Sequence, residues 1–445
     1  IAIILGMILT AANVYLGLYV GMTVSASIPA AVISMATLRT LANSKYISDT
    51  NILENNWVQT AVSAGESLAA GVIFTLPALI IMEQGDSTVW SDFPYFTTFA
   101  IALIGGTVGV LFSISLRQIF VVKEKLPYPE GVACAEVLMA GEKGGAQVKP
   151  IFFGLLFGTI FKLGASLQIV KDGFIQKVSL GLWKNAWHGH FTIKGKLAEL
   201  GSVEKVRSTI FLGAELSPAL LGVGYIVGPA IGTFVFLGGL LGAIIILPMT
   251  SGLLFVPDGM AISEYISFIE MRRRMVGVGT MLIGGLYTLV LMRKPITRGI
   301  TDMIKKANQS TESSSLRTEM DLPANLIAKI IGLSLIPILL LIWGLSKLFA
   351  PALIALIIIF TAGYLFAAIA GYMAGIVGSS NNPLSGVTII VVIFTSSILA
   401  LLNKFFYGGA HTEDLQIAVI GAAAFVACAG AISGDNLQDL KTGYI

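Results

Sequence analysis

The chain has 445 residues, of which 55% are hydrophobic and only 12% are charged. Soluble domains carry about 25% charged residues, so this composition excludes a soluble globular protein and indicates a polytopic membrane protein. The net charge of +3 is small, and the Lys and Arg residues are dispersed between apolar segments. Nucleic acid is therefore not expected as a partner, and the lipid bilayer is the expected main solvent.

Apolar runs separated by polar breaks predict about twelve membrane-spanning helices. The chain starts inside the first run, without an initiator Met and without the basic flank of a signal peptide. We therefore expect a retained helix at the start of a truncated chain. The predicted spans cover residues 1–20, 24–41, 63–82, 96–117, 151–170, 208–226, 229–248, 277–292, 326–349, 351–377, 384–402 and 415–432.

Several spans are interrupted by Gly or Pro, for example at Gly17, Gly21, Pro29 and Pro77. Such residues free backbone groups at membrane depth, which neighbouring protein or a wet cavity must satisfy. This pattern is typical of a transporter interior with broken helices. The alternative is that the glycines bring helices close together in a simple bundle.

Loop charges predict the orientation of the chain. Residues 83–94 are acidic, whereas residues 117–149 and 293–317 hold the Lys and Arg excess expected of cytoplasmic loops. With this orientation the basic triplet at 272–274 falls outside, so at least one of the spans 208–226 and 229–248 is predicted to be re-entrant.

A weak internal repeat predicts two related halves. The stretch Gly21–Ile33 resembles Val377–Ile390, because each has a Gly and Ser-rich opening, then Pro, then a helix that begins with small residues. The predicted organisation is a first transmembrane half at 1–292, a basic cytoplasmic linker at 293–325, and the start of a truncated second half at 326–445.

The first polar cluster is NILENNWVQTAVSAGES, from Asn51 to Ser67. Helical spacing places Asn55, Gln59 and Ser63 on one face, with Asn51 and Glu54 a turn away. Glu66 lies at the start of the following apolar run. A carboxylate there is a candidate for proton or substrate coupling, since an ionised group inside lipid is costly. The alternative is a cap of an interfacial helix.

The second cluster is EKLPYPEGVACAEVLMAGEKGG, from Glu124 to Gly145. Its two prolines predict an extended turn that opens a short helix containing Glu136, too short to cross a bilayer. A re-entrant hairpin fits this pattern, with Glu136 as a candidate for proton coupling. An amphipathic helix on the cytoplasmic surface is the alternative.

Three further stretches hold polar residues at expected helix breaks. The stretch SGDNLQDLKTGY places Asp435, Gln438 and Asp439 in a short break at the end of a span, unless it is a solvated loop. Asn381 and Asn382 lie in GSSNNPLSG. Glu215 lies in an apolar frame that is interrupted by Pro and Gly, which is typical of an unwound helix lining a path.

Enzyme motifs are missing from the sequence. The pair His188 and His190 lacks the further ligands of a metal site, and His411 stands alone. Cys134 and Cys428 have no CxxC spacing, so neither a disulfide framework nor a metal site is expected. The sequence has no HExxH, G-x-S-x-G or Walker motif, so we expect no enzyme, and no cofactor beyond a proton gradient.

These motifs together resemble the oligopeptide transporter (OPT) family, more closely its prokaryotic and yellow stripe-like branch than its fungal peptide branch. The resemblance rests on NILENNWVQTAVSAGES followed by FTLPAL, on LPYPEG, on GSSNNPLSG and on SGDNLQDLKTGY, in family order. It implies an all-helical carrier of two related halves that imports short peptides or metal chelates together with protons. The motif positions are Asn51, Glu54, Asn55, Gln59, Glu66, Pro127, Pro129, Asn381, Asn382, Asp435, Gln438, Asp439 and Lys441.

The sequence therefore predicts an all-α, multi-pass importer in the cell (inner) membrane, with a short peptide or a peptide-like solute as the cargo of proton-coupled transport. Import of a metal chelate is the alternative cargo, a channel or a membrane-embedded enzyme is the alternative class, and a homo-oligomer remains open. The predicted substrate-binding residues are Asn51, Glu54, Asn55, Gln59, Glu215, Asn381, Asn382, Asp435 and Gln438. The predicted proton-coupling residues are Glu66, Glu136 and Glu215.

Overall fold

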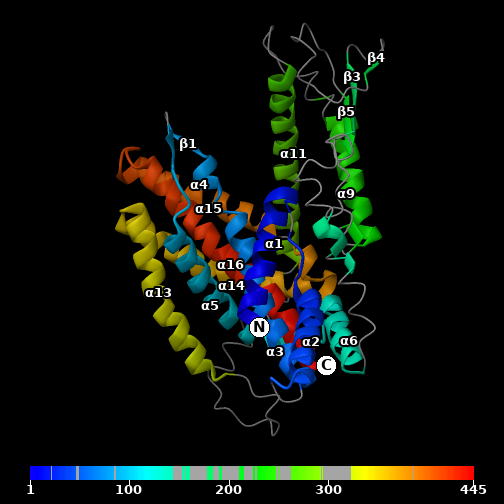
Figure 1. Cartoon of the computed structure of the whole chain (residues 1–445). Coiled ribbons are helices and arrows are strands. Elements are labelled where there is room, and N and C mark those ends of the chain that lie inside the picture. Colours follow the sequence, from blue (N-terminus) through cyan, green and yellow to red (C-terminus); the bar gives the residue numbers. More distant parts are fainter. Residues whose placement is uncertain are drawn as a thin grey trace. The chain divides into compact units, whose positions relative to one another are not determined.

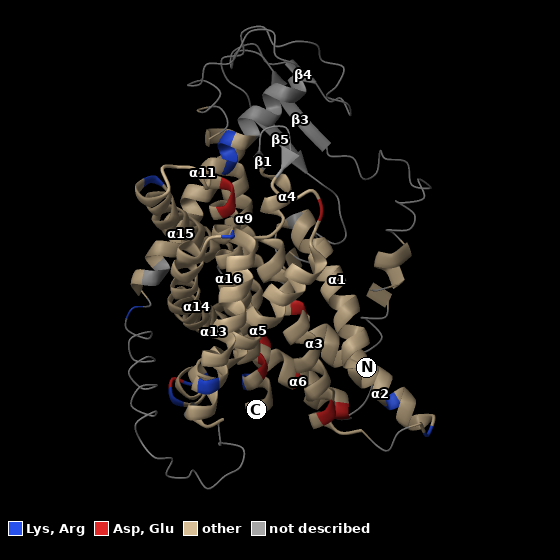
Figure 2. Ribbon diagram, turned by 90° about the vertical axis from the view of Figure 1, so that its left-hand side faces the viewer, with Lys and Arg blue, Asp and Glu red and all other residues tan. Residues whose placement is uncertain are grey.

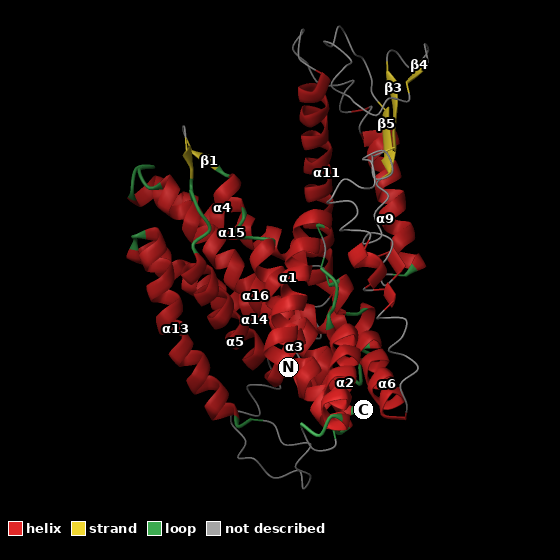
Figure 3. Cartoon of the chain, in the orientation of Figure 1, coloured by secondary structure: helices red, strands yellow, loops and turns green. Residues whose placement is uncertain are grey.

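Helices make up most of the computed structural model (Figure 3). The structure describes residues 1–21, 23–46, 50–84, 87–143, 153–154, 156–160, 178–183, 190–192, 210–214, 224–225, 228–246, 249, 262–291, 293, 322–382 and 384–445. The chain divides into two compact units, one of Ile1–Val148 with Met281–Ile445 and one of Lys149–Thr280. Each unit is described separately.

The described residues of the first unit form helices and one small hairpin (Figure 1). Its hairpin pairs β1 (Glu83–Gln84) with β2 (Ser87–Thr88) in antiparallel register. Its helices are α1 (Ala2–Val20), α2 (Ser27–Asn43), α3 (Ile52–Ile73), α4 (Ala78–Ile81), α5 (Tyr95–Arg117), the π-helical η1 (Gln118–Lys123), α6 (Pro129–Lys143), α13 (Ala324–Ser346), α14 (Phe349–Val377), the 3-10 turn η6 (Ser379–Asn381), α15 (Leu384–Phe406) and α16 (Thr412–Tyr444).

The second unit contains a three-stranded antiparallel sheet with the order β4-β3-β5. Its strands are β3 (Val178–Trp183), β4 (His190–Thr192) and β5 (Ile210–Ala214), and its helices include α9 (Pro229–Leu241) and the π-helical η4 (Gly242–Ile246). Helix α11 (Ile262–Leu291) begins in this unit and ends in the first. The predicted span at 208–226 is wrong over Ile210–Ala214, because a short apolar run fits a strand as well as a helix.

Eight described helices are long and apolar enough to cross a membrane, which confirms a multi-pass helical membrane protein. Most of their ribbon carries neither acidic nor basic residues (Figure 2). Most of the predicted span at 151–170 lies outside the described residues, as do most of the predicted linker 293–325, His188 and Glu215. The eight segments are Ala2–Tyr19, Ile52–Ile81, Tyr95–Lys123, Pro229–Ile246, Asn325–Ser346, Phe349–Val377, Leu384–Phe406 and Thr412–Tyr444.

Helix α16 is the centre of the first unit, packed against α3, α5, α6, α13, α14 and α15. Residues Ala418–Gly434 of this helix are all buried. The prediction that the helix breaks at Ser433 is wrong, since α16 runs unbroken for 33 residues from Thr412 to Tyr444. Its polar residues need no break, because side chains on neighbouring helices supply their hydrogen-bond partners.

The start of α3 also lies earlier than predicted. The helix begins at Ile52, and the Asn51 side chain caps it by accepting a hydrogen bond from the Glu54 backbone N–H at 2.9 Å. The polar stretch after Asn51 is therefore part of the same helix as the apolar run. Gln59 and Glu66 consequently lie on one continuous, rigid element.

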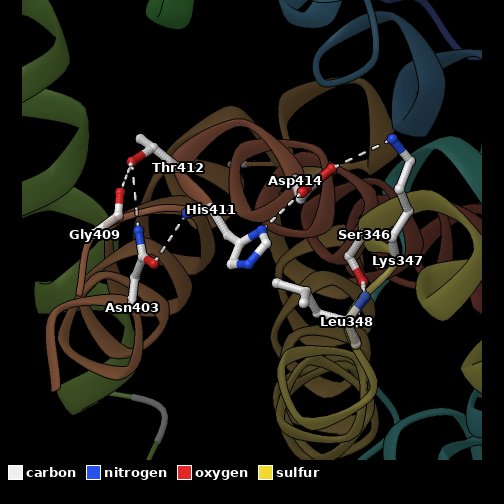
Figure 4. Close-up of polar contacts among 8 residues, drawn as sticks. All are labelled: Ser346, Lys347, Leu348, Asn403, Gly409, His411, Thr412 and Asp414. Atoms are coloured by element: carbon white, nitrogen blue, oxygen red, sulfur yellow. Dashed lines mark hydrogen bonds and ion pairs between the residues drawn. The ribbon is translucent and has the colours of Figure 1, made fainter. Parts of the chain in front are cut away.

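The amino end of α16 is held by the loop that precedes it (Figure 4). Asn403 accepts a hydrogen bond from the His411 backbone N–H at 3.3 Å, and its amide donates to Thr412 Oγ1 at 3.4 Å. Asp414 lies 3.3 Å from His411 Nδ1 and 3.8 Å from Lys347 Nζ. The Lys347 side chain is largely exposed, so its ion pair contributes little, and the buried Asn403 does most to fix the loop.

Two glycines let α16 approach its neighbours closely. A Cβ added to Gly71 of α3 would lie 2.6 Å from Cys428 Cα, and one added to Gly109 of α5 would lie 2.7 Å from Ala429 Cα. Both contacts involve backbone atoms, which cannot rotate away. The sequence left open whether glycines in the spans serve packing, and at these two positions they do.

We expect Gly71→Ala to destabilise the protein by about 1–3 kcal/mol, because the methyl group would force α3 and α16 apart. The measurement is the thermal denaturation midpoint of the full-length protein in detergent. The matched control is Gly332→Ala on α13, where an added Cβ would meet nothing within 4 Å. Equal midpoints for the two variants would contradict this packing argument.

Candidate functional site

Two helix breaks meet inside the first unit. Residues 21–26 separate α1 from α2, and residues 378–383 separate α14 from α15. Each break opens on a glycine with positive φ, Gly21 with φ 79° and Gly378 with φ 91°. The breaks touch, because the Ser25 backbone N–H donates to Ser380 Oγ at 3.2 Å.

A narrow cavity, partly open to solvent, lies where the breaks meet α3 and α16. Its walls leave room for about one water molecule, so a larger solute enters only if the walls move. The lining is mainly hydroxyl, amide and carboxyl groups, with few apolar side chains. The lining residues are Thr23, Ser25, Glu66, Ser67, Ala70, Ser379, Ser380, Asn382, Leu384, Ala431 and Asp435.

Glu66 accepts hydrogen bonds at the first break. The side chain is only 2% exposed, and its Oε2 accepts the Ala26 backbone N–H at 3.2 Å, at the amino end of α2. Its Oε1 accepts a hydrogen bond from the Asn13 amide. Asn13 in turn accepts the Val24 backbone N–H at 3.0 Å. The carboxylate and this amide thus satisfy backbone groups that the break leaves without helical partners.

Two carboxylates of α16 lie beside the first break. Asp439 is 3% exposed, and its Oδ1 accepts hydrogen bonds from Ser27 Oγ at 3.0 Å and from Gln59 Nε2 at 2.5 Å. Asp435 accepts a hydrogen bond from the Ser67 hydroxyl. These contacts connect α16 to both α2 and α3 at the level of the cavity.

Gln438 of α16 connects the two breaks. Its Oε1 accepts the Ser379 backbone N–H at 3.2 Å, and its Nε2 donates to Ser25 Oγ at 3.4 Å. Its side chain is fully buried. An amide suits this position because it can accept on one side and donate on the other.

The carboxylates share one chemical feature. Within the described part of the chain, Glu66, Asp435 and Asp439 have hydroxyl, amide and backbone N–H partners, and no described Lys or Arg forms an ion pair with them. Carboxylates at membrane depth are costly, so these three side chains are candidates for functional residues.

The structure brings together five of the residues predicted from the sequence. Glu66, Asn382 and Asp435 line the cavity, and Gln438 forms hydrogen bonds with both breaks. Gln59 does not line the cavity but donates a hydrogen bond to Asp439. Asn382 also donates to the Ala370 carbonyl at 3.3 Å. The side chain of Asn381 and the whole of Glu215 lie outside what the structure describes.

Four other predicted residues lie away from the cavity. Asn51 and Glu54 are exposed at the start of α3, and Glu136 is exposed on α6. Asn55 is buried between α2 and α3, where it accepts a hydrogen bond from Ser34 Oγ at 3.2 Å. A substrate or proton role for these residues stays a prediction.

Sequence reasoning missed several residues of the site, chiefly Asn13, Ser25, Ser67 and Ser380. It also missed Glu130, which lies outside the cavity lining and accepts hydrogen bonds from Ser379 and Ser380. Asn13 carried a usable signal, because it is an amide in the middle of a 19-residue apolar helix. Glu130 lies in the LPYPEG motif, but Glu136 was selected from that helix instead. The serines carry no comparable signal, since Ser is common at helix ends for other reasons.

Comparisons with known proteins agree with the resemblance seen in the sequence. The family described as "OPT oligopeptide transporter protein" matches residues 1–445. A Haemophilus influenzae protein named "Putative oligopeptide transporter" is 36% identical over 447 residues, covering 97% of this chain and 65% of its own length. A similarly named Saccharomyces cerevisiae protein is 29% identical over 153 residues, covering 31% of this chain and 20% of its own.

We expect Asn13→Leu to lower the stability of the protein by about 2–4 kcal/mol, because it leaves the Val24 N–H and one Glu66 oxygen buried without this partner. Thermal denaturation in detergent measures the effect. Met7→Leu, at an exposed position of the same helix, is the control. The assignment of Asn13 to the first break would be wrong if both variants melted like the parent.

Proposed function

Because this chain belongs to the OPT family of oligopeptide transporters, we propose that it forms part of a proton-coupled importer of short peptides or peptide-like solutes in the cell (inner) membrane. The family is one of transporters, not of enzymes. The observation that carries the proposal is the cavity between two helix breaks, with Glu66 and Asp435 in its lining. Broken helices around a midmembrane site are the usual construction of secondary transporters.

Glu66 is the leading candidate for the proton carrier. Its two oxygens accept hydrogen bonds from Asn13 on α1 and from the Ala26 backbone N–H at the start of α2. A proton on this carboxyl group would remove one of these acceptor sites, because the protonated oxygen becomes a donor. Protonation would therefore change how tightly the first break is held, which is a physical route from proton binding to movement.

The lining of the cavity suits a peptide-like solute. Hydroxyl and amide groups such as Ser25, Ser380 and Asn382 can donate to carbonyl groups and accept from N–H groups. The carboxylates suit the cationic amino end of a short peptide. Because the cavity as it stands has room for about one water molecule, even a dipeptide requires the breaks to separate.

Related halves would account for the paired breaks. The first break follows α1 and the second follows α14, each opens on a glycine with positive φ, and each is followed by a helix and then a long helix with buried polar residues. This correspondence supports the proposed halves at 1–292 and 326–445, joined by the linker 293–325. The chain spans 65% of the length of its Haemophilus influenzae relative.

We expect Glu66→Gln to abolish the stimulation of uptake by an inward proton gradient, because an amide cannot take up and release a proton at physiological pH. The measurement is dipeptide uptake into proteoliposomes of the full-length protein, with and without an imposed pH gradient. Glu413→Gln, at an exposed position on α16, is the control.

Unchanged acid-stimulated uptake in Glu66→Gln would remove Glu66 from the coupling role. Loss of uptake in Glu413→Gln as well would mean that the assay reports general damage to the protein. Flux that does not saturate and that moves no protons would instead indicate a channel.

A competition assay decides between a peptide and a metal chelate as cargo. We expect an excess of unlabelled dipeptide to reduce uptake of a labelled dipeptide by about tenfold, and an iron-chelate complex to reduce it by less than about twofold. The described residues hold no group of three or more His, Cys, Asp or Glu side chains placed to bind a metal. A chelate that competes as well as the dipeptide would overturn the peptide preference.

A further inference from the structure

The segment that joins η1 to α6 binds the end of α14, just before the second helix break. The Tyr128 backbone N–H donates to the Gly375 carbonyl at 2.8 Å, and the Tyr128 hydroxyl donates to the Gly371 carbonyl at 3.0 Å. Burial, with a smaller contribution from the nearby Glu124 carboxylate, raises the pKa of the Tyr128 phenol. The hydroxyl therefore keeps its proton and remains a donor. These two bonds fix the last turns of α14 to the LPYPEG motif.

Glu130, two residues after Tyr128, reaches the break itself. Its Oε2 accepts a hydrogen bond from the Ser379 hydroxyl at 3.0 Å, and its Oε1 accepts the Ser380 backbone N–H at 3.3 Å. Both serines line the cavity. One carboxylate thus holds two consecutive residues of the break in a defined position.

The close fit around Glu130 depends on Gly378. A Cβ added to this glycine would lie 2.5 Å from Glu130 Oε1 and 2.8 Å from its Cδ. The glycine therefore does two things: it provides the positive-φ turn that ends α14, and it leaves room for the carboxylate. A side chain at position 378 would therefore displace the Glu130 carboxylate from the break.

We propose that Glu130 is a positioning residue of the transport site, which holds Ser379 and Ser380 so that the second break closes over the cavity. The proposal rests on the proposed function, and Glu130 acts through the break and does not itself line the cavity. Ser380 links Glu130 to the first break, since the Ser380 hydroxyl accepts a hydrogen bond from the Ser25 backbone N–H. Without Glu130, Ser379 and Ser380 would lose the hydrogen bonds that this carboxylate accepts from them.

Hydrogen bonding, and not negative charge, is the expected basis of this role. In Glu130→Gln the amide oxygen can still accept the Ser380 N–H, and the amide nitrogen can donate to the Ser379 hydroxyl, which also accepts. Glu130→Ala removes both bonds. The pair of variants therefore separates a positioning role from a role as proton carrier or as a charged ligand.

The test uses the full-length protein with its native cysteines replaced by alanine and with Ala431→Cys in the cavity wall. We expect Glu130→Ala to raise the rate at which a small water-soluble reagent modifies the introduced thiol about tenfold, because the break no longer covers it. Glu130→Gln should stay within about twofold of the parent. Glu142→Ala, at an exposed position on the same helix, is the control and should also stay at the parent rate.

Transport kinetics provide the second readout. In proteoliposomes, Glu130→Ala should raise the KM for the dipeptide dialanine about fivefold or more while changing kcat less, whereas a purely structural defect would lower only the amount of active protein. If Glu130→Ala yields no folded protein, Ser379→Ala removes a single bond and should raise the modification rate about threefold.

The inference is overturned if folded Glu130→Ala is modified at the parent rate, or if Glu130→Gln behaves like Glu130→Ala. Failure of the proposed function gives a different result. If the parent does not take up dialanine, the assigned cargo is wrong, and the modification rates alone decide the role of Glu130.

Discussion

The structure depends on one constraint, which is that a polar backbone group released from a helix inside a membrane protein must find a partner in the protein. Two helix breaks lie within the first unit, and each break finds its partners on other helices. Asn13 and Glu66 satisfy the first break, and Glu130 and Gln438 satisfy the second. The buried polar residues and the breaks therefore form a single feature, since neither is stable without the other.

Helix α16 makes this arrangement compact. Gly71 of α3 and Gly109 of α5 let these two helices approach α16 closely, so that short side chains can bridge the remaining distance. Asp435 reaches Ser67 for this reason, and Asp439 reaches Ser27 and Gln59. A bulkier α16 would separate these groups and leave the carboxylates without partners, at a cost of several kcal/mol for each buried charge.

The sequence predicted the helical membrane architecture and the two breaks well, because apolar length and Gly, Ser and Pro clusters are local signals. It also singled out Glu66, which lines the cavity, since a carboxylate in an apolar run stands out without any knowledge of packing. It could not decide which polar residues of a cluster face inward. Glu130 and Glu136 lie on the same short helix, and only the position of the second break distinguishes Glu130 from Glu136. The course of α16 beyond Ser433 was missed for the same reason, because partners distant in the sequence make a polar helix stable.

The distribution of contacts indicates where movement can occur. Each break is tied firmly to its own supporting helices, the first to α1 and α3 and the second to α6 and α16. Between the described residues of the two breaks, the direct link is the single bond from Ser25 to Ser380, with Gln438 as a bridge to Ser25 at 3.4 Å. Hydrogen bonds of this length between neutral groups contribute about 0.5–1.5 kcal/mol each. On the proposed function, the cavity therefore opens more easily by separating the two breaks as intact units than by unwinding either of them.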